Sequence, residues 1–320
     1  MSLNLTVDKN GSGDFTDIVS ALDSVNNGEA AVIYIKNGVY EEKLIIDKPD
    51  ITLVGQDRVK TVITYSDSAF MVNEAGEQIG TFETATVHVL PSAEGFEAYN
   101  LSIINAAGIG SIVGQATALY LDCDKAVVKD CVIKARQDTL LTAPMFLDIE
   151  RDPSIYNRQI FKNCYIEGDV DFIFGGAAAG FEDCEIFSLD RANGYHCYVT
   201  AACTSDKLKY GYVFRNCHIG GNAANNSAYL GRPWREHANV VFLDCNIGKC
   251  ISRQGFVKWN DTNRHETAFY AFHNCSGEGY DEDGLVEWCR VLTDDEAAQY
   301  TDDNIFSGWK YEYMDYEDLI

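Results

Sequence analysis

Short apolar runs separated by turns of Gly, Asn and Asp fill the chain from residue 31 to about residue 259. They are rich in Val, Ile, Thr, Tyr and Phe and are too short for helices, so each predicts a β-strand. The first runs are Ala31–Ile35, Lys43–Ile46, Ile51–Val54, Val62–Tyr65, Thr86–Leu90, Ala98–Ile104 and Ala118–Leu121. A period of roughly 20 to 33 residues predicts an all-β fold, a single-stranded right-handed parallel β-helix of about seven or eight coils. A β-sandwich would share this strand content.

Both ends of the chain carry helical signals. Apolar residues recur at helical spacing over Thr16–Val25, which predicts a helix with Thr16 as N-cap, lying over the first coil. Thr293–Glu296 is a capping box that predicts a short helix to about Tyr300. The acidic and aromatic tail Asp302–Ile320 is expected to pack along the outside of the coils.

The chain has no linker rich in Pro or Ser, so we expect one domain over residues 1–320. Residues 1–30 form an N-terminal cap, 31–290 the coils and loops, and 291–320 the C-terminal helix and tail. Because a solenoid with covered ends has no open strand edge, a monomer is expected.

Six of the eleven cysteines repeat one local context, an Asn or Asp followed by Cys. These pairs are Asp130-Cys131, Asn163-Cys164, Asp183-Cys184, Asn216-Cys217, Asp244-Cys245 and Asn274-Cys275. The repeat predicts a small apolar side chain that faces inward on successive coils, and parallel side-chain vectors favour thiols over disulfides. This cysteine usage mildly favours a reducing, cytoplasmic compartment.

Composition excludes several classes of function. The net charge of −24 argues against nucleic-acid binding, because phosphates select basic surfaces. No run of 18 apolar residues is present, so no membrane span is expected. The start, Met1-Ser2-Leu3, shows no signal segment, and the sequence leaves localisation open.

Candidate chemistry lies between Cys131 and Asp171. Asp138 follows Cys131 at the same spacing in the sequence as Asp171 follows Cys164. The two cysteines are 33 residues apart (164 − 131), and so are the two aspartates (171 − 138). If 33 residues make one coil, the two carboxylates lie side by side, about 4.8 Å apart along the coil axis. Two carboxylates at that distance tend to share a proton, which provides an acid and a nucleophile in one place.

An arbitrary Asp pair is more often two solvated turn residues. Here the neighbours favour function, because Asp171 begins the apolar stretch Asp171–Gly175, where a charge is costly without a purpose or a partner. The six histidines are scattered, and no nucleophile elbow provides a serine, so a Ser-His-Asp hydrolase is not expected.

Five motifs make the chain resemble the pectin methylesterases, a family of carbohydrate esterases built on a right-handed parallel β-helix. They are Gly38–Glu42, Gly114–Leu119, Gln137–Leu140, Asp171–Gly175 and Leu230–Trp234, in the family's order and over nearly the whole chain. The resemblance implies hydrolysis of galacturonate methyl esters, with methyl-esterified homogalacturonan or oligogalacturonides as the substrate. It also implies a role in pectin catabolism and cell wall modification, and members of this family are often secreted.

The resemblance also implies a role for each site residue. Asp171 would be the nucleophile and Asp138 the general acid and later the base, with Arg232 holding Asp171 and the substrate. Gln115 and Gln137 would form the oxyanion hole.

Three further residues would contact substrate. Trp234 would face a sugar ring, Phe174 would line a subsite, and Thr81 resembles a substrate-contacting threonine. No cofactor and no metal is expected.

Physical chemistry fits these roles. A neutral amide donor stabilises the developing oxyanion without holding the carboxylate product too tightly. Arg232 would lower the pKa of Asp171 and keep it ionised. The high negative charge of the protein favours a heavily methylated and nearly neutral substrate.

Two other functions stay open. A pectate lyase or a polygalacturonase-like depolymerase would share the fold. The lyase would need a calcium site and a basic residue. The polygalacturonase would need Asp or Glu carboxylates across the glycosidic bond. A non-catalytic carbohydrate-binding solenoid would not need the Asp, Gln and Arg set.

Overall fold

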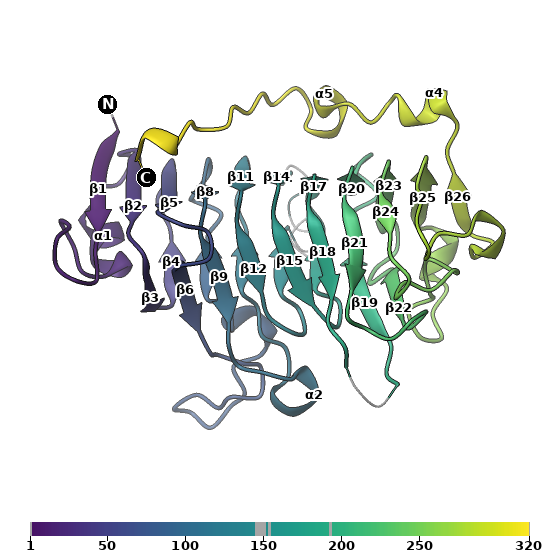
Figure 1. The fold of residues 1–320 in the computed structure, drawn as a ribbon, viewed down its shortest axis with the longest axis horizontal. Helices are drawn as coiled ribbons and strands as arrows, with labels where there is room; N and C mark the ends of the chain where they lie inside the picture. The colour runs from purple at the N-terminus through teal and green to yellow at the C-terminus, as the bar shows by residue number, and fades with distance from the viewer. Residues whose placement is uncertain (1, 145–151, 153–154, 192–193, 320) are drawn as a thin grey trace. The chain divides into compact units, whose positions relative to one another are not determined.

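A computed structural model of the protein describes residues 2–144, 152, 155–191 and 194–319. The chain divides into two compact units. The first comprises residues 1–140, 163–165 and 311–320, and the second comprises 141–162 and 166–310. Both consist mainly of short parallel strands (Figure 1).

In the first unit the strands form three sheets. Sheet A contains β1 (Leu3–Val7), β2 (Ala31–Ile35), β5 (Ile51–Gly55), β8 (Glu97–Tyr99) and β11 (Ala126–Lys129). Sheet B contains β3 (Gly38–Glu41), β6 (Thr61–Tyr65), β9 (Ser102–Asn105) and β12 (Val132–Lys134). Sheet C contains β4 (Leu44–Ile46), β7 (Val87–Val89) and β10 (Leu119–Leu121). The helices are α1 (Ile18–Ser24), η1 (Thr81–Glu83), α2 (Gly110–Val113) and η4 (Glu317–Leu319).

The second unit repeats this arrangement. Its sheet A contains β14 (Arg158–Lys162), β17 (Ala178–Glu182), β20 (Tyr212–Arg215), β23 (Asn239–Leu243), β25 (Phe269–His273) and β26 (Cys289–Val291). Its sheet B contains β15 (Tyr165–Gly168), β18 (Glu185–Ser188), β21 (His218–Gly221) and β24 (Asn246–Ile247). Its sheet C contains β13 (Leu140–Thr142), β16 (Ile173–Gly175), β19 (Cys197–Ala202) and β22 (Ala228–Gly231). The helices are η2 (Arg264–Glu266), η3 (Glu282–Gly284), α4 (Asp294–Ala297) and α5 (Asp302–Ile305).

From β2 to β24 the chain visits sheets A, B and C in turn, and successive strands of one sheet pair in parallel. This order defines a parallel β-helix, right-handed as nearly all parallel crossovers are. The predicted fold class is confirmed. Among the described residues, none of the helices is both long and apolar enough to cross a membrane.

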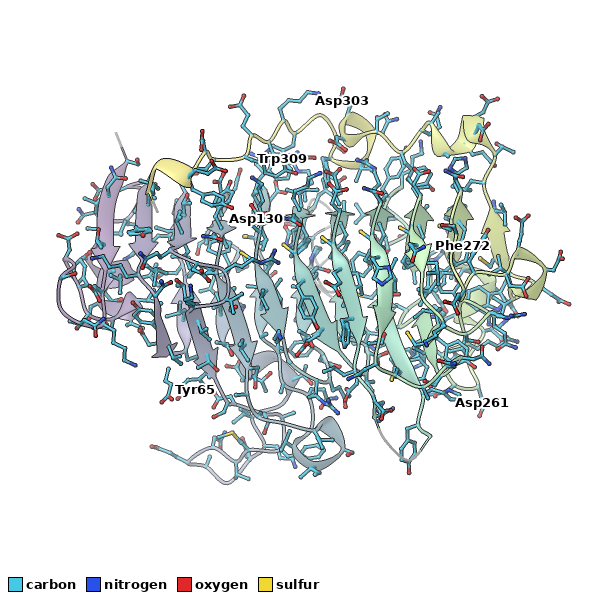
Figure 2. The ribbon with its side chains drawn as sticks, in the orientation of Figure 1. Tyr65, Asp130, Asp261, Phe272, Asp303 and Trp309 are labelled. Carbon is cyan, nitrogen blue, oxygen red and sulfur yellow. The ribbon has the colours of Figure 1, made fainter. Side chains whose placement is uncertain are left out.

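A column of phenylalanines fills the core of the second unit beneath sheet A. The rings of Phe161, Phe181, Phe214 and Phe242 stack with centroid separations of 4.8, 4.4 and 4.6 Å. Phe272, labelled in Figure 2, continues the column at 5.6 Å. The spacing is that of neighbouring strands, because each ring occupies the same register position on its coil.

The repeated Asx-Cys pairs form the corners between sheets A and B. Each Asn or Asp has a left-handed backbone with φ between 49° and 56°, and the cysteine that follows turns inward. Five of the six cysteines are buried and Cys275 is partly exposed, so the predicted inward packing is confirmed. Asn and Asp are suited to this corner because their short polar side chains tolerate the left-handed region. Asn216 also donates from Nδ2 to Oδ1 of Asp183 on the previous coil at 2.5 Å.

One predicted strand was wrong. The run Ala98–Ile104 is split into β8 and β9, with a corner at Asn100 and Leu101. Asn100 has φ 55° and donates through Nδ2 to Gly55 O at 2.9 Å, so it acts like the Asx of the cysteine corners. Leu101 replaces the cysteine as the inward apolar residue and is fully buried.

The N-terminal helix is shorter than predicted and is capped by a different residue. It begins at Ile18, and its N-cap is Asp17 rather than Thr16, with the Asp17 carboxylate accepting from Ser20 N at 2.8 Å. A carboxylate is the better acceptor for the exposed N–H groups at this end. The segment ahead of the helix also contributes β1, which pairs with β2.

The C-terminal region matches expectation in its cap and its packing. Thr293 forms the predicted capping box with Glu296, although α4 ends at Ala297 rather than near Tyr300. In the second unit Arg215 binds Asp302 Oδ1 at 2.7 Å and Tyr300 O at 2.9 Å. This contact fixes the segment that carries α5 against the outside of sheet A, as Figure 1 shows.

The corner geometry predicts that replacing Asn216 by Ala destabilises the protein more than replacing it by Gly. Replacing Asn216 by Ala should lower the free energy of unfolding by roughly 1–2 kcal/mol, because Ala resists the left-handed backbone and loses the bond to Asp183. Asn216→Gly should lose less, since glycine adopts positive φ without strain. Urea unfolding curves of the three proteins measure this. Equal losses for Ala and Gly would contradict the backbone explanation.

Candidate active site

The candidate residues fall into two groups, one in each unit. Gln115, Gln137, Asp138 and Thr81 belong to the first unit. Asp171, Phe174, Arg232 and Trp234 belong to the second.

In the first unit the backbone brings the two glutamines together. Ala116 N, next to Gln115, donates to Gln137 O at 3.1 Å. Gly110, the first residue of α2, packs against the Gln137 side chain so closely that a Cβ there would lie 2.7 Å from Oε1. Only glycine leaves room for this amide, and the two amides are partly exposed in the same region. Each of the two side chains ends in an amide group that can donate hydrogen bonds.

The loop with Thr81 is tied to the same region. Gly80 N donates to Ala69 O at 3.2 Å, and Ala69 N donates to Gln115 O at 2.8 Å. Thr81 opens the short helix η1 and is partly exposed. The structure therefore links Thr81 to Gln115 through hydrogen bonds of the backbone.

Asp138 and Asp171 have the same local conformation. Asp138 has φ 64° and lies two residues before β13, and Asp171 has φ 49° and lies two residues before β16. Both are buried, with 8% and 7% of their surfaces exposed. A left-handed backbone at a buried residue other than glycine costs free energy and is frequent at functional sites.

Arg232 binds both carboxylate oxygens of Asp171. Its Nε donates to Oδ1 at 2.9 Å and its Nη2 donates to Oδ2 at 2.7 Å. Only 16% of the Arg232 side chain and 10% of the Asp171 side chain are exposed, so the pair is largely desolvated. Two parallel charge-assisted bonds of this kind fix both the position and the orientation of the carboxylate.

Burial and Arg232 act on Asp171 in opposite directions. Burial raises the pKa of the Asp171 carboxyl, whereas the hydrogen bonds and charge of Arg232, and the charge of Arg191, lower it. Burial has the larger effect, so the pKa lies above its ordinary value. The expectation that Arg232 lowers this pKa is correct for Arg232 itself, but it is wrong for the net shift.

Phe174 and Trp234 lie together in the second unit. Their ring centroids are 5.9 Å apart with an edge-to-face angle of 61°. Phe174 is buried and Trp234 is partly exposed. Arg264 Nη1 and Arg235 Nη1 donate to Trp234 O at 2.6 and 2.8 Å, which fixes the tryptophan backbone.

Sequence reasoning missed two aromatic residues beside Arg232. The guanidinium carbon lies 3.9 Å from the ring centroid of Tyr198 and 4.3 Å from that of Trp259. Neither residue belongs to a motif that carried the resemblance. Both residues lie far from Arg232 in the sequence, so the sequence does not predict these contacts. The register of the coils brings the three residues together.

The described residues contain no group of three or more His, Cys, Asp or Glu side chains placed to hold a metal ion.

Comparison with known proteins identifies the family. The family model described as Pectinesterase matches residues 4–308. Putative pectinesterase 11 of Arabidopsis thaliana is 35% identical over 311 residues, covering 95% of this chain and 79% of that protein.

Solved structures agree with this match. Pectin methylesterase from carrot superposes with a TM-score of 0.84 at 31% identity and covers 96% of this chain and 94% of its own. A pectin methylesterase in complex with hexasaccharide VII gives a TM-score of 0.82 at 27% identity, covering 98% and 100%. The chain belongs to the pectinesterase family and is a carboxylic ester hydrolase.

Proposed function

We propose that the chain hydrolyses methyl esters of galacturonate in pectin or oligogalacturonides, with Asp171 as the nucleophile. The observation that carries this proposal is a buried carboxylate bound through both oxygens by Arg232. Such a carboxylate is oriented and poorly hydrated, which suits it for attack on an ester carbonyl. The complex of a related methylesterase with a hexasaccharide supports an oligosaccharide substrate.

The proposed reaction has two stages. Asp171 attacks the ester carbonyl, and the side-chain amides of Gln115 and Gln137 stabilise the tetrahedral oxyanion. Asp138 donates a proton to the leaving methoxide, so methanol departs and an anhydride with Asp171 remains. Asp138 then takes one proton from water, whose attack on the anhydride restores the Asp171 carboxylate and releases galacturonic acid, which loses the second proton to solvent.

The pairing of Asp138 with Asp171 is a proposal that rests on their equivalent places in the coils. Both lie two residues before a strand of sheet C, both have a left-handed backbone, and 33 residues separate them (171 − 138). Equivalent positions on successive coils lie about one strand spacing apart. A neutral Asp138 beside an ionised Asp171 would then supply both acid and nucleophile.

The two aromatic rings in the second unit support a sugar-binding role for Trp234 and Phe174. The partly exposed indole of Trp234 offers an apolar face to a pyranose ring, and Phe174 supports it edge to face. Thr81 is proposed as a further contact, through the loop that is tied to Gln115.

Product analysis tests the function. The protein is incubated with methylated pectin and a chelator, and methanol, unsaturated uronides and new reducing ends are measured. Methanol alone supports the proposed esterase. Unsaturated uronides indicate a lyase, new reducing ends indicate a hydrolase, and the absence of all three indicates a binding protein.

Replacing Asp171 by Asn should lower methanol release on the order of a thousandfold or more, because the amide is a poor nucleophile. Asp183→Asn is the matched control. Asp183 has the same left-handed backbone, with φ 51°, and Asn occupies the equivalent corner on the next coil at Asn216. The control should retain wild-type turnover. Substantial turnover by the Asp171 variant would remove Asp171 from the nucleophile's role.

The raised pKa of Asp171 predicts where activity fails in acid. The nucleophile must be ionised, so kcat/KM should fall as the pH drops through a pKa above the ordinary Asp value of about 3.9. The fall of kcat/KM on the acidic side of the pH profile is called the acidic limb. Arg232→Lys keeps the charge but loses the second hydrogen bond to Asp171, so the acidic limb should move to higher pH. Arg253→Lys, at the exposed ion pair with Asp281, is the control. A limb that stays in place in the Arg232 variant would contradict the assignment.

The charge of the protein predicts a preference for methylated substrate. With a net charge of −24, the protein repels demethylated polygalacturonate, so kcat/KM should rise with the degree of methylation at low salt. Added salt should reduce the difference, because exposed charges are screened over about 8 Å at physiological ionic strength. Initial rates on pectins of graded methylation at two salt concentrations measure this. Rates that rise as methylation falls would contradict it.

A further inference from the structure

Three consecutive coils of the second unit form a stack around one guanidinium. Thr200 of β19 pairs with Gly231 of β22, and Gly231 in turn pairs with Phe256 on the following coil. Tyr198, Arg232 and Trp259 come from these three coils in that order. The coil register therefore places an aromatic ring before and after Arg232.

The two rings lie close to the guanidinium. Its carbon is 3.9 Å from the Tyr198 centroid and 4.3 Å from the Trp259 centroid, distances at which cation–π attraction operates. A guanidinium is weakly hydrated on its two faces and donates hydrogen bonds only in its plane. Rings that lie against these faces would leave the in-plane N–H groups available, and two of these groups bind Asp171.

Both rings are themselves held in place. Tyr198 stacks on Tyr229 of the next coil at 6.0 Å with an interplanar angle of 13°. The Trp259 backbone is fixed by Thr262, whose hydroxyl donates to Trp259 O at 2.7 Å. The guanidinium of Arg264 lies 5.9 Å from the centre of the Trp259 ring. A turn away from Arg232 would also move the Tyr198 ring off Tyr229, and it would move the Trp259 ring away from the Arg264 guanidinium.

We propose that Tyr198 and Trp259 are positioning residues for ester hydrolysis, which hold the Arg232 guanidinium in the plane that binds both oxygens of Asp171. This inference rests on the proposed role of Asp171 as nucleophile. The rings act through Arg232, and they affect how well Asp171 is aimed and how readily it ionises.

The electrostatic surroundings of Asp171 make this effect measurable. The charged and titratable groups that interact with Asp171 include Arg232, Arg191, Tyr198 and Tyr270. Arg232 opposes the effect of burial through both its hydrogen bonds and its charge. A guanidinium that loses one supporting ring becomes mobile and better hydrated, so it stabilises the carboxylate less and the pKa of Asp171 rises.

The test compares Tyr198→Leu and Trp259→Leu with Tyr198→Phe and Trp259→Phe. The Leu variants remove the aromatic face and should lower kcat about tenfold, with a smaller change in KM. Their acidic limb should move to higher pH by about half a unit to one unit. The Phe variants keep a ring and should stay within about threefold of wild type.

A matched control removes an indole ring that lies beside another arginine of the same unit. Trp309, labelled in Figure 2, lies 5.8 Å from the Arg158 guanidinium. Trp309→Leu should leave kcat and the acidic limb unchanged. Circular dichroism and melting curves show that each variant is folded under the assay conditions.

A double variant separates positioning from packing. In an Arg232→Lys background the second bond to Asp171 is already lost, so adding Trp259→Leu should cost less than about threefold in kcat. An unchanged tenfold cost in this background would overturn the proposal. So would Leu variants that raise KM with the limb unmoved, because the rings would then contact substrate directly. Lower melting temperatures with wild-type kcat and limb would also overturn it.

A measurement that needs no turnover keeps this inference apart from the proposed function. The ¹³C resonance of the Asp171 carboxyl, assigned by its absence in Asp171→Asn, is titrated in wild type and in both Leu variants. The pKa from this titration should rise in each Leu variant. If wild type releases no methanol, the proposed function fails while the titration still tests the inference. If it releases methanol and the titration curves coincide, the inference alone fails.

Discussion

Register between parallel coils is the constraint on which the rest of this protein depends. Each strand of a sheet pairs with the strand one coil later, residue for residue, so equivalent side chains repeat along the axis at one strand spacing. The phenylalanine column and the Asx-Cys corners are direct results of this repetition. A side chain that packs well on one coil therefore has similar neighbours at the equivalent position of the next coil.

The same repetition creates the buried ion pair. Asp171 and Arg232 lie 61 residues apart in sequence, yet they meet because the coils between them are stacked in register. Taking both charges out of water is costly, and a buried pair is stable only with good geometry and further partners. Here the two parallel hydrogen bonds and the aromatic faces of Tyr198 and Trp259 offset part of that cost. The remaining cost appears as the raised pKa of Asp171.

Strands were predictable because they depend on local composition. The run Ala31–Ile35 became β2 without change, whereas the split at Asn100 was missed because Leu101 stands where other corners carry cysteine. That corner had a signal, since Asn100 lies 30 residues before Asp130 (130 − 100). The aromatic contacts of Arg232 could not be predicted from the sequence. They depend on which residues of neighbouring coils share a register position, and loops of variable length hide that position.

The corners between sheets A and B also determine where the chain tolerates a change of length. From β8 to β24 each of these corners consists of two residues, one Asn or Asp with a left-handed backbone and one inward apolar residue. An insertion there would turn every side chain of the following strand to the opposite face. The connections from sheet B to sheet C and from C to A vary widely in length while the strands they join stay paired. Sequence drift and protein engineering can therefore change the length of those loops where they carry none of the candidate site residues, while the two-residue corners keep the coils in alignment.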